Sequence, residues 1–294
     1  MKKGIAERRS WWRRAGRFLG YHAGEAIVWF FMIGVAVFEI APISWLFSTS
    51  LVEPAHSFDL PPKFFPTAFH WENYLAVLNS TEIDFVRFFW NSLRVAATVT
   101  GAQLLTCSMA GFAFARLRFP GRAPLFFLFL ASMMVPFQVV MIPTFIIIRV
   151  LGMMDTHWSL ILPSATSAFG IFLMRQQFMT LPEELMEAAR MDGASFLRVY
   201  AQILLPLVGP GLSALAVLTF LASWNSFMAP LLFIRTWERF TLPLALVQLK
   251  GYMGMGNRAH VLAGVMMSVF PLMVLFLLAQ RHILQGISTT GLKY

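Results

Sequence analysis

The sequence predicts an all-α polytopic membrane protein with six transmembrane helices, and three observations support this class. Hydrophobic residues make up 58% of the 294-residue chain and charged residues only 13%, whereas soluble proteins average about 25% charged residues. Six segments contain the roughly 20 mainly apolar residues that a spanning helix needs. Most Lys and Arg residues lie between these segments, so the net charge of +9 indicates a membrane rather than nucleic acid.

The N-terminal region predicts a basic tail followed by the first membrane helix. Residues 1–25 carry seven Lys or Arg residues, and an apolar run follows at 26–51. A secretory signal has an apolar region of roughly 7–15 residues and then a cleavage site. The run at 26–51 is far longer, so we expect it to be kept as a transmembrane helix.

The remaining spans are expected to pack as a bundle within residues 26–281. The six expected spans are 26–51, 91–115, 124–148, 158–178, 206–234 and 261–281. The second contains small residues such as Gly101 and Gly111, which allow helices to approach closely in lipid. The third contains Pro136 and Pro143, which a membrane helix tolerates as kinks when neighbouring groups satisfy its backbone.

The distribution of charge between the spans predicts their orientation. With the N-terminus inside, the cytoplasmic segments hold fifteen Lys and Arg residues, counting Arg175 and Arg281 at the cytoplasmic ends of their spans and Lys293 in the C-terminal tail 282–294, and the external segments hold seven. An excess of Lys and Arg marks the cytoplasmic side of a membrane protein. We therefore expect both termini to lie in the cytoplasm.

The cytoplasmic segment 180–206 has the pattern of short helices rather than of coil. Thr180 and Glu183 have the spacing of a capping box, in which each residue's side chain binds a backbone N–H at the start of a helix. Pro182 suits the first turn, where no hydrogen bond is lost. We expect a first helix over about 182–191.

A second short helix is expected after a glycine corner. Gly193 supplies the left-handed backbone conformation at which helices end, and a helix over about 195–205 would lead into the fifth span. On the first helix, Leu185, Ala188 and Ala189 share a face by their 3–4 spacing. The small alanines make part of this face shallow, which suits insertion into a groove of another protein.

The same segment carries the residues of a known motif. In order, they are Glu187-Ala188-Ala189, three residues ending in Asp192, then Gly193, nine residues, and Ile203-Leu204-Leu205-Pro206. This spacing, in the penultimate cytoplasmic loop of a six-span chain, resembles the EAA loop of permease subunits in ATP-binding-cassette importers. An ordinary amphipathic hairpin at the membrane interface is the alternative interpretation.

The resemblance covers nearly the whole chain and is greatest to the carbohydrate-importer branch, in particular its shorter, maltose-type six-helix subunit. Further similar stretches are Asn91-Ser92-Leu93, Gly111 to Arg116, Trp224-Asn225, Thr241-Leu242-Pro243 and Gln285 to Lys293. The resemblance implies that the chain forms half of a heterodimeric pore in the bacterial cytoplasmic membrane. This pore would import a sugar or sugar-like solute by alternating access.

The resemblance also implies partners and contact sites. The partners would be a sister permease, two ATPase subunits that hold the ATP and Mg, and an extracytoplasmic solute-binding protein. The residues that would couple the pore to the ATPases are Glu187, Ala188, Ala189, Asp192, Gly193, Ile203, Leu205 and Pro206. The residues that would contact the solute-binding protein are Lys250, Gly251, Tyr252, Gly254 and Gly256.

The chain is not expected to be an enzyme or to hold a cofactor. No lysine follows a glycine, so the Gly-x-x-x-x-Gly-Lys-Ser/Thr loop that cradles nucleotide phosphates is absent from the sequence. Cys107 is the single cysteine, which excludes an intramolecular disulfide and a metal site built from several cysteines. The six histidines are scattered without a metal-binding spacing. We therefore expect no catalytic, cofactor-binding or metal site.

Polar residues within the expected spans are candidates for lining the solute pathway. They are Glu39, Gln138 and Asn225, together with the neighbouring Trp224. Polar and ionisable residues in a membrane usually face the interior of a bundle or a cavity. Trp224 and Asn225 together suit stacking on and hydrogen bonding to a sugar-like solute. The alternative is a structural hydrogen bond within the bundle for Glu39 and between helices for Asn225.

Two other classes of membrane protein remain as alternatives. A secondary transporter would show internal symmetry and broken helices around an ion site, and no repeat is visible between the two halves of the chain. A membrane enzyme would have clustered catalytic carboxylates or histidines at one face. The only acidic cluster, at Glu183, Glu184, Glu187 and Asp192, lies in the coupling segment itself.

Overall fold

In the computed structural model, every regular element of the described residues is helical; these residues are 2–53, 65, 68–80, 84–252 and 258–290. The chain forms two compact units, one of residues 1–73 and 256–263 and the other of residues 74–255 and 264–294. The helices are α1 (Lys2–Ser50), α2 (Glu72–Leu78), α3 (Phe85–Arg116), α4 (Arg122–Ser132), α5 (Phe137–Val150), α6 (Trp158–Ile161), α7 (Ala168–Met179), α8 (Glu184–Met191), α9 (Phe196–Arg198), α10 (Leu205–Leu207), α11 (Gly209–Trp224), α12 (Met228–Phe233), α13 (Leu242–Tyr252) and α14 (Arg258–Thr290). A π-helical turn, Val199–Leu204, joins α9 to α10, and a 3₁₀ turn, Trp237–Arg239, precedes α13.

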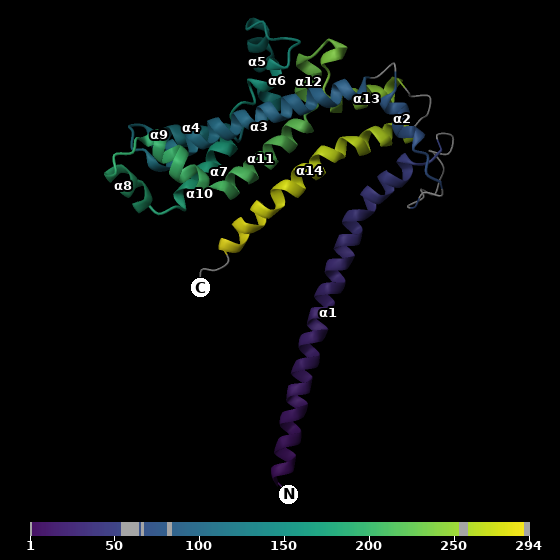
Figure 1. Ribbon diagram of the computed structural model, residues 1–294, viewed down its shortest axis with the longest axis vertical. Helices are drawn as coiled ribbons and strands as arrows, with labels where there is room; N and C mark the ends of the chain where they lie inside the picture. The colour runs from purple at the N-terminus through teal and green to yellow at the C-terminus, as the bar shows by residue number, and fades with distance from the viewer. Residues whose placement is uncertain (1, 54–64, 66–67, 81–83, 253–257, 291–294) are drawn as a thin grey trace. The chain divides into compact units, whose positions relative to one another are not determined.

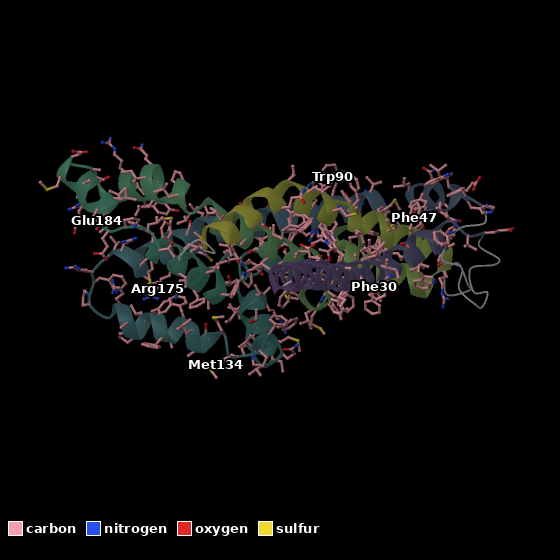
Figure 2. The ribbon with its side chains drawn as sticks, turned by 90° about the horizontal axis from the view of Figure 1, so that it is seen from below. Phe30, Phe47, Trp90, Met134, Arg175 and Glu184 are labelled. Atoms are coloured by element: carbon pink, nitrogen blue, oxygen red, sulfur yellow. The ribbon has the colours of Figure 1, made fainter. Side chains whose placement is uncertain are left out.

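The first unit is dominated by α1, whose segment Glu25–Ser50 is long and apolar enough to cross a membrane. Its apolar side chains are exposed, with Phe30 at 82% (Figure 2). Such surface is unfavourable in water by about 25 cal/mol per Å² and favours a lipid environment. The Asn73 side chain donates to the carbonyls of Ser50 and Val52, each at 2.9 Å, and so satisfies acceptors at the end of the helix.

In the second unit, α3 packs along α7 and α11 (Figure 1). The closest approach is at Gly111, where an added Cβ would lie 2.6 Å from Met174 Cβ and 2.8 Å from the backbone nitrogen of Arg175. The prediction that a small residue permits close packing is therefore confirmed at Gly111. At Gly101 an added Cβ would have no atom within 4 Å, so this glycine does not serve the same purpose.

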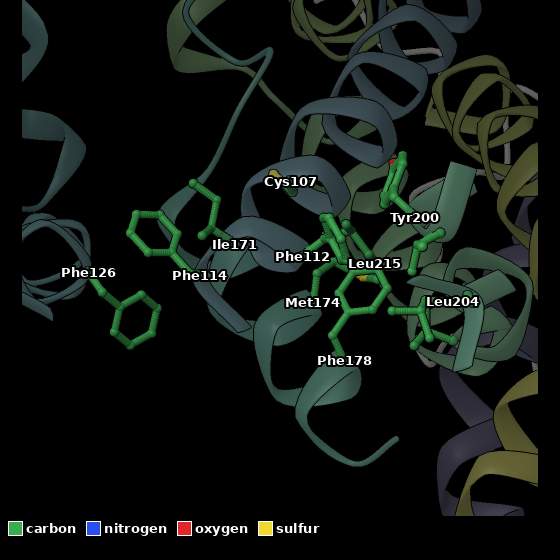
Figure 3. Packing of buried hydrophobic residues seen from close by; sticks show 13 residues of the cluster. Cys107, Phe112, Phe114, Phe126, Ile171, Met174, Phe178, Tyr200, Leu204 and Leu215 are labelled. Atoms are coloured by element: carbon green, nitrogen blue, oxygen red, sulfur yellow. The ribbon is translucent and has the colours of Figure 1, made fainter. Parts of the chain in front are cut away.

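A buried core and a polar hub hold α3, α7 and α11 together. Figure 3 shows Phe112, Met174, Phe178 and Leu215 meeting from these three helices. Nearer the start of α3, the Gln103 amide donates to the Ser164 carbonyl and its Oε1 accepts hydrogen bonds from the hydroxyls of Ser167 and Thr219. A buried amide with three hydrogen bonds of this kind fixes the register of the elements that it joins.

Three of the six expected spans are divided rather than continuous. The segment 124–148 consists of α4 and α5, which meet at 102°. Pro136 is the N-cap of α5, and the residue before a proline is driven out of the helical conformation, so this proline breaks the helix. Pro143, by contrast, is tolerated within α5. The expected helix 158–178 is α6 and α7, and the expected helix 206–234 ends as α11 at Trp224 before α12 begins.

Among the described residues, three helical segments are each long and apolar enough to span a membrane: Glu25–Ser50, Phe85–Arg116 and Arg258–Gln280. Two bent pairs meet the same test if each is counted as one span. The all-α membrane class is therefore confirmed, whereas the count of six spans and their orientation stay predictions.

A carboxylate joins the turn after α5 to the segment before α13. Asp155 has a positive φ of 57° and accepts hydrogen bonds from the N–H groups of Arg235 and Thr236 and from the Thr236 hydroxyl. Burial alone would raise the pKa of Asp155, but these hydrogen bonds and the charge of Arg239 lower it to about 2. The aspartate is therefore ionised at neutral pH, and this link loses strength only as the pH falls below about 4.

Candidate functional site

The segment after α7 forms two short helices joined at a glycine corner, as the sequence predicts. The first is α8, and Gly193 follows it with φ of +81°. The Ser195 hydroxyl then accepts a hydrogen bond from the N–H of Arg198 at 3.3 Å and caps the next helical stretch. No atom lies within 4 Å of the place where a Cβ of residue 193 would be. Backbone conformation, rather than space, therefore favours glycine at this position.

The expected capping box at the start of α8 is wrong. The Thr180 hydroxyl donates to the carbonyl of Gln177 at 2.8 Å, because Thr180 is the C-cap residue of α7 rather than a cap of α8. The N-cap residue of α8 is Glu183, and it makes no side-chain capping bond. The helix α7 extends up to residue 179, so Thr180 lies at the end of one helix instead of the start of the next. The capping-box pattern by itself does not reveal where the preceding helix ends.

The exposed face of α8 differs from the expected face at one residue, Ala189. Ala189 is 7% exposed and packs in the core that α8 shares with α3 and α7, so it does not belong to an outward face. Leu185 and Ala188 do lie on the exposed side. Two further apolar side chains are exposed: Met191 at the end of α8, at 88%, and Leu197 in α9, at 66%. The result is an exposed apolar surface of Leu185, Ala188, Met191 and Leu197, here called the coupling surface.

A tyrosine anchors this segment to the core. Tyr200 lies in the π-helical turn, and its hydroxyl is 2.7 Å from the buried hydroxyl of Ser108 on α3. Its ring packs against Phe112 and Phe178, with centroids 5.4 and 6.4 Å away. A buried hydroxyl needs a hydrogen-bond partner. The Tyr200–Ser108 contact therefore fixes the position of the coupling segment relative to α3.

Arg116, the last residue of α3, is a second anchor. Its Nη2 donates to the carbonyl of Phe178 at 2.6 Å and to that of Leu181, so its positive charge lies at the C-terminal end of α7. Cations stabilise this end of a helix, where carbonyl groups lack partners. The sequence pattern includes Arg116 only as the end of the Gly111 to Arg116 stretch and gives no signal for Tyr200.

The remaining predicted coupling residues are distributed over the same segment. Glu187 is exposed on α8 and has no ion pair within the described part of the chain. Asp192 is the exposed C-cap residue of α8. Ile203 and Leu205 are half-buried and pack against the core, and Pro206 is exposed. The segment therefore has inward residues that hold it and outward residues that are available to a partner.

The predicted pathway residues of the second unit do not line the cavity beside Gln103. This cavity of about 320 Å³ lies between α3, α6 and α11 and is lined by Gln103, Ser223, Ser226 and Thr241 but not by Gln138, Trp224 or Asn225. Gln138 and Asn225 are exposed, and Glu39 lies on the exposed surface of α1. A role of any of the four in the pathway stays a prediction.

Trp224 has structural contacts that the sequence does not reveal. Its ring is buried, stacks on Phe220 at 5.6 Å between centroids and meets Phe89 edge-on at 5.6 Å. Its indole N–H donates to the carbonyl of Ser268 on α14 at 3.1 Å. The neighbouring Asn225 donates from Nδ2 to the carbonyl of Leu221 on its own helix.

The predicted contact with a solute-binding protein also stays a prediction. Gly254 and Gly256 lie outside the described residues. Lys250, Gly251 and Tyr252 belong to the last turn of α13, so the segment between the expected fifth and sixth spans contains an eleven-residue helix.

Comparison with known proteins gives consistent matches over most of the chain. Residues 107–289 match the family described as binding-protein-dependent transport system inner membrane component. The arabinooligosaccharides transport system permease protein of Bacillus subtilis is 32% identical, with 91% of this chain and 95% of that protein covered. The sn-glycerol-3-phosphate transport system permease protein of Yersinia enterocolitica is 31% identical, with 87% and 92% covered.

A solved structure supports the fold. A chain of a bacterial ABC transporter involved in the import of the acidic polysaccharide alginate aligns with a TM-score of 0.75 at 24% identity, covering 87% of this chain and 95% of that one. The long apolar helices, the two-helix segment around Gly193 and these matches agree with one another. The chain thus belongs to the family of binding-protein-dependent transport system inner membrane components, the permease subunits of ATP-binding-cassette importers.

Proposed function

We propose that this chain is one of two permease subunits of an ATP-driven importer for a sugar or sugar-like solute, and that it passes the motion of the ATPases to the pore through α8. A family member of this kind works with ATPase subunits and a solute-binding protein. The chain lacks a phosphate-binding loop of its own, so the energy source lies on the ATPases. ATP binding brings the ATPases together, α8 moves with them, and the spans alternate between inward and outward access.

The observation that carries this proposal is the exposed coupling surface on a segment anchored in the core. Apolar side chains such as Met191 and Leu197 are exposed on α8 and on the three-residue α9. Exposed apolar side chains that are neighbours on a helix, as Leu185, Ala188 and Met191 are by their spacing of three, are typical of an interaction site. Tyr200 and Arg116 connect this surface to α3 and α7, so a displacement of α8 is transmitted to the spans.

The solute class rests on the relatives. Relatives that match over most of their length include permeases named for arabinooligosaccharides and for sn-glycerol-3-phosphate, and the structural neighbour is involved in the import of an acidic polysaccharide. Each of these three solutes is either a carbohydrate or a phosphorylated polyol. The comparisons favour neither a secondary transporter nor a membrane enzyme.

The experiment for this function is co-purification of the permease with its ATPase, using Glu187→Gln as the variant. The wild-type chain, expressed in its own organism, should retain an ATPase subunit through affinity purification. Glu187→Gln removes a charge that has no ion pair among the described residues. We expect it to weaken ATPase binding roughly 10- to 100-fold, because a charge-assisted hydrogen bond contributes about 1.5–3 kcal/mol.

The matched control is Glu238→Gln, which removes a charge from an exposed residue outside the coupling segment and should leave ATPase binding unchanged. Purification of the wild-type chain without any ATPase would contradict the importer function. Equal binding by both variants would contradict only the role of Glu187.

The orientation is proposed from the excess of basic residues in the segments assigned to the cytoplasm. A reporter enzyme that is active only in the periplasm, fused after Tyr294, should give no activity. The same reporter inserted after residue 65, in the first external loop, should be active. Activity of the C-terminal fusion would show that the number of spans is odd and would overturn this orientation.

A further inference from the structure

A second feature of the coupling segment is a large basic cavity behind α8, with a volume of about 780 Å³. It lies between the C-terminal ends of α3 and α7, the start of α4, and the two short helices. Five arginines line it, against only two glutamates, Glu183 and Glu187. The arginines are Arg116, Arg118, Arg122, Arg175 and Arg190. The cavity therefore carries an excess of positive charge.

Three of the arginines are oriented by groups other than carboxylates. The guanidinium groups of Arg175 and Arg190 lie over the rings of Phe126 and Phe196, 4.3 and 4.1 Å from the centroids. Arg122 donates to the carbonyl of Leu117 at 3.0 Å. Carbonyls and aromatic rings orient a guanidinium group and leave its full charge available.

Arg116 is the most buried of the five arginines. Its side chain is 4% exposed, and two of its hydrogen bonds go to the carbonyls of Phe178 and Leu181. The carboxylate oxygen of Glu183 is 4.0 Å from Nη1, and the Glu183 side chain is 76% exposed. Arg116 therefore adds to the cavity wall a positive charge that only this distant carboxylate opposes.

The chemistry of the cavity fits a phosphate group. Arginine forks bind phosphate oxygens through paired hydrogen bonds, and basic pockets at the cytoplasmic ends of membrane helices bind anionic lipid headgroups. Arg122 is the first residue of α4, and the next turns of that helix expose Leu125, Phe127 and Leu128. A ligand with a phosphate and acyl chains would therefore contact both the basic cavity and the apolar surface beside it.

We propose that this cavity binds the phosphate of an anionic phospholipid from the cytoplasmic leaflet, with the acyl chains lying along α4. Because Glu187 and Arg190 of α8 form one wall of the cavity, the bound headgroup sets the position of α8 and supports its coupling to the ATPases. The inference rests on the proposed orientation, which places α8 at the cytoplasmic face. The binding itself does not depend on which solute is imported.

The experiment compares lipid binding by the purified transporter complex, using native mass spectrometry after delipidation and titration with phosphatidylglycerol or phosphatidylcholine. The variant is Arg118→Gln with Arg122→Gln, two arginines outside the buried core. Its control is Arg149→Gln with Arg235→Gln, which removes two charges from exposed residues elsewhere. We expect phosphatidylglycerol to be retained by the wild-type and control complexes and to bind the variant about 10- to 30-fold more weakly, at about 1 kcal/mol per arginine near a membrane surface.

Four results would overturn the proposal. Equal retention of the two lipids, or unchanged binding by the Arg118/Arg122 variant, would show that the cavity is not a headgroup site. Displacement of phosphatidylglycerol by millimolar inorganic phosphate would assign the site to a free anion. Retention of phosphatidylglycerol only after removal of the ATPase subunit would assign the arginines to an acidic surface of that subunit. Because lipid binding is measured without transport, these results are separate from the test of the importer function.

Discussion

Replacing Gly193 with valine should weaken the association of the permease with its ATPase by roughly 5- to 30-fold, while the chain still reaches the membrane. The residue has φ of +81°, which a β-branched side chain opposes by roughly 1–2 kcal/mol. The corner would relax to a negative φ and turn α8 relative to the helical stretch that follows. The coupling surface would then no longer match its groove. ATPase retention during purification and ATP hydrolysis by the reconstituted complex measure this effect.

Gly193→Asn is the matched control, because asparagine tolerates the left-handed conformation. No atom lies within 4 Å of a Cβ at this position, so a loss caused by bulk is not expected from either substitution. Asparagine should therefore retain most of the ATPase association. An equal loss of ATPase association in the two variants would contradict a conformational role of Gly193. Unchanged association in both variants would show that the corner is not needed for coupling.

Gly111→Ala should lower the stability of the helical bundle by about 2–3 kcal/mol. The added Cβ would lie 2.6 Å from Met174 Cβ and 2.8 Å from the backbone nitrogen of Arg175, and backbone atoms cannot rotate away. The helices α3 and α7 would have to separate, which loosens the core around Phe112 and Phe178. Overpacking of this kind typically costs about 1–3 kcal/mol. The midpoint of thermal unfolding of the detergent-solubilised chain, followed by size-exclusion chromatography, should fall by several degrees.

Gly101→Ala on the same helix is the control, because nothing lies within 4 Å of its added Cβ. Alanine also has the higher helix propensity, so this variant should unfold at the wild-type temperature or slightly above it. If the two alanine variants unfolded at the same temperature, close packing at Gly111 would not limit the stability of the bundle.

Features that depend on local sequence or on the size of one side chain were predictable. The left-handed corner at Gly193 follows from the need for a residue without Cβ at the end of a helix, and Ser195 has the side chain of a typical helix cap. The close approach at Gly111 follows from a small residue within an apolar segment. In each case the deciding interaction lies within a few residues or depends on side-chain size alone.

Features that depend on distant residues were not predictable. The role of Arg116 requires that the carbonyls of Phe178 and Leu181, more than sixty residues away, lie beside the end of α3. The inward position of Ala189 depends on which side of α8 faces the core. A helical wheel shows that Leu185, Ala188 and Ala189 are neighbours, but not where the boundary between partner-facing and core-facing residues falls. The break at Pro136 likewise depends on whether neighbouring helices satisfy the freed backbone groups.

The π-helical turn Val199–Leu204 limits how this chain can change in evolution. In this turn the N–H of Leu205 bonds to the carbonyl of Tyr200, five residues back, instead of four. The extra residue is taken up within the turn, so an ordinary α-helix with one residue fewer would join the same two ends. Loss of one residue from an α-helix, by contrast, rotates everything before it by about 100°. A single deletion is therefore better tolerated within this turn, at a residue other than Tyr200 with its contact to Ser108, than in the helices on either side of it.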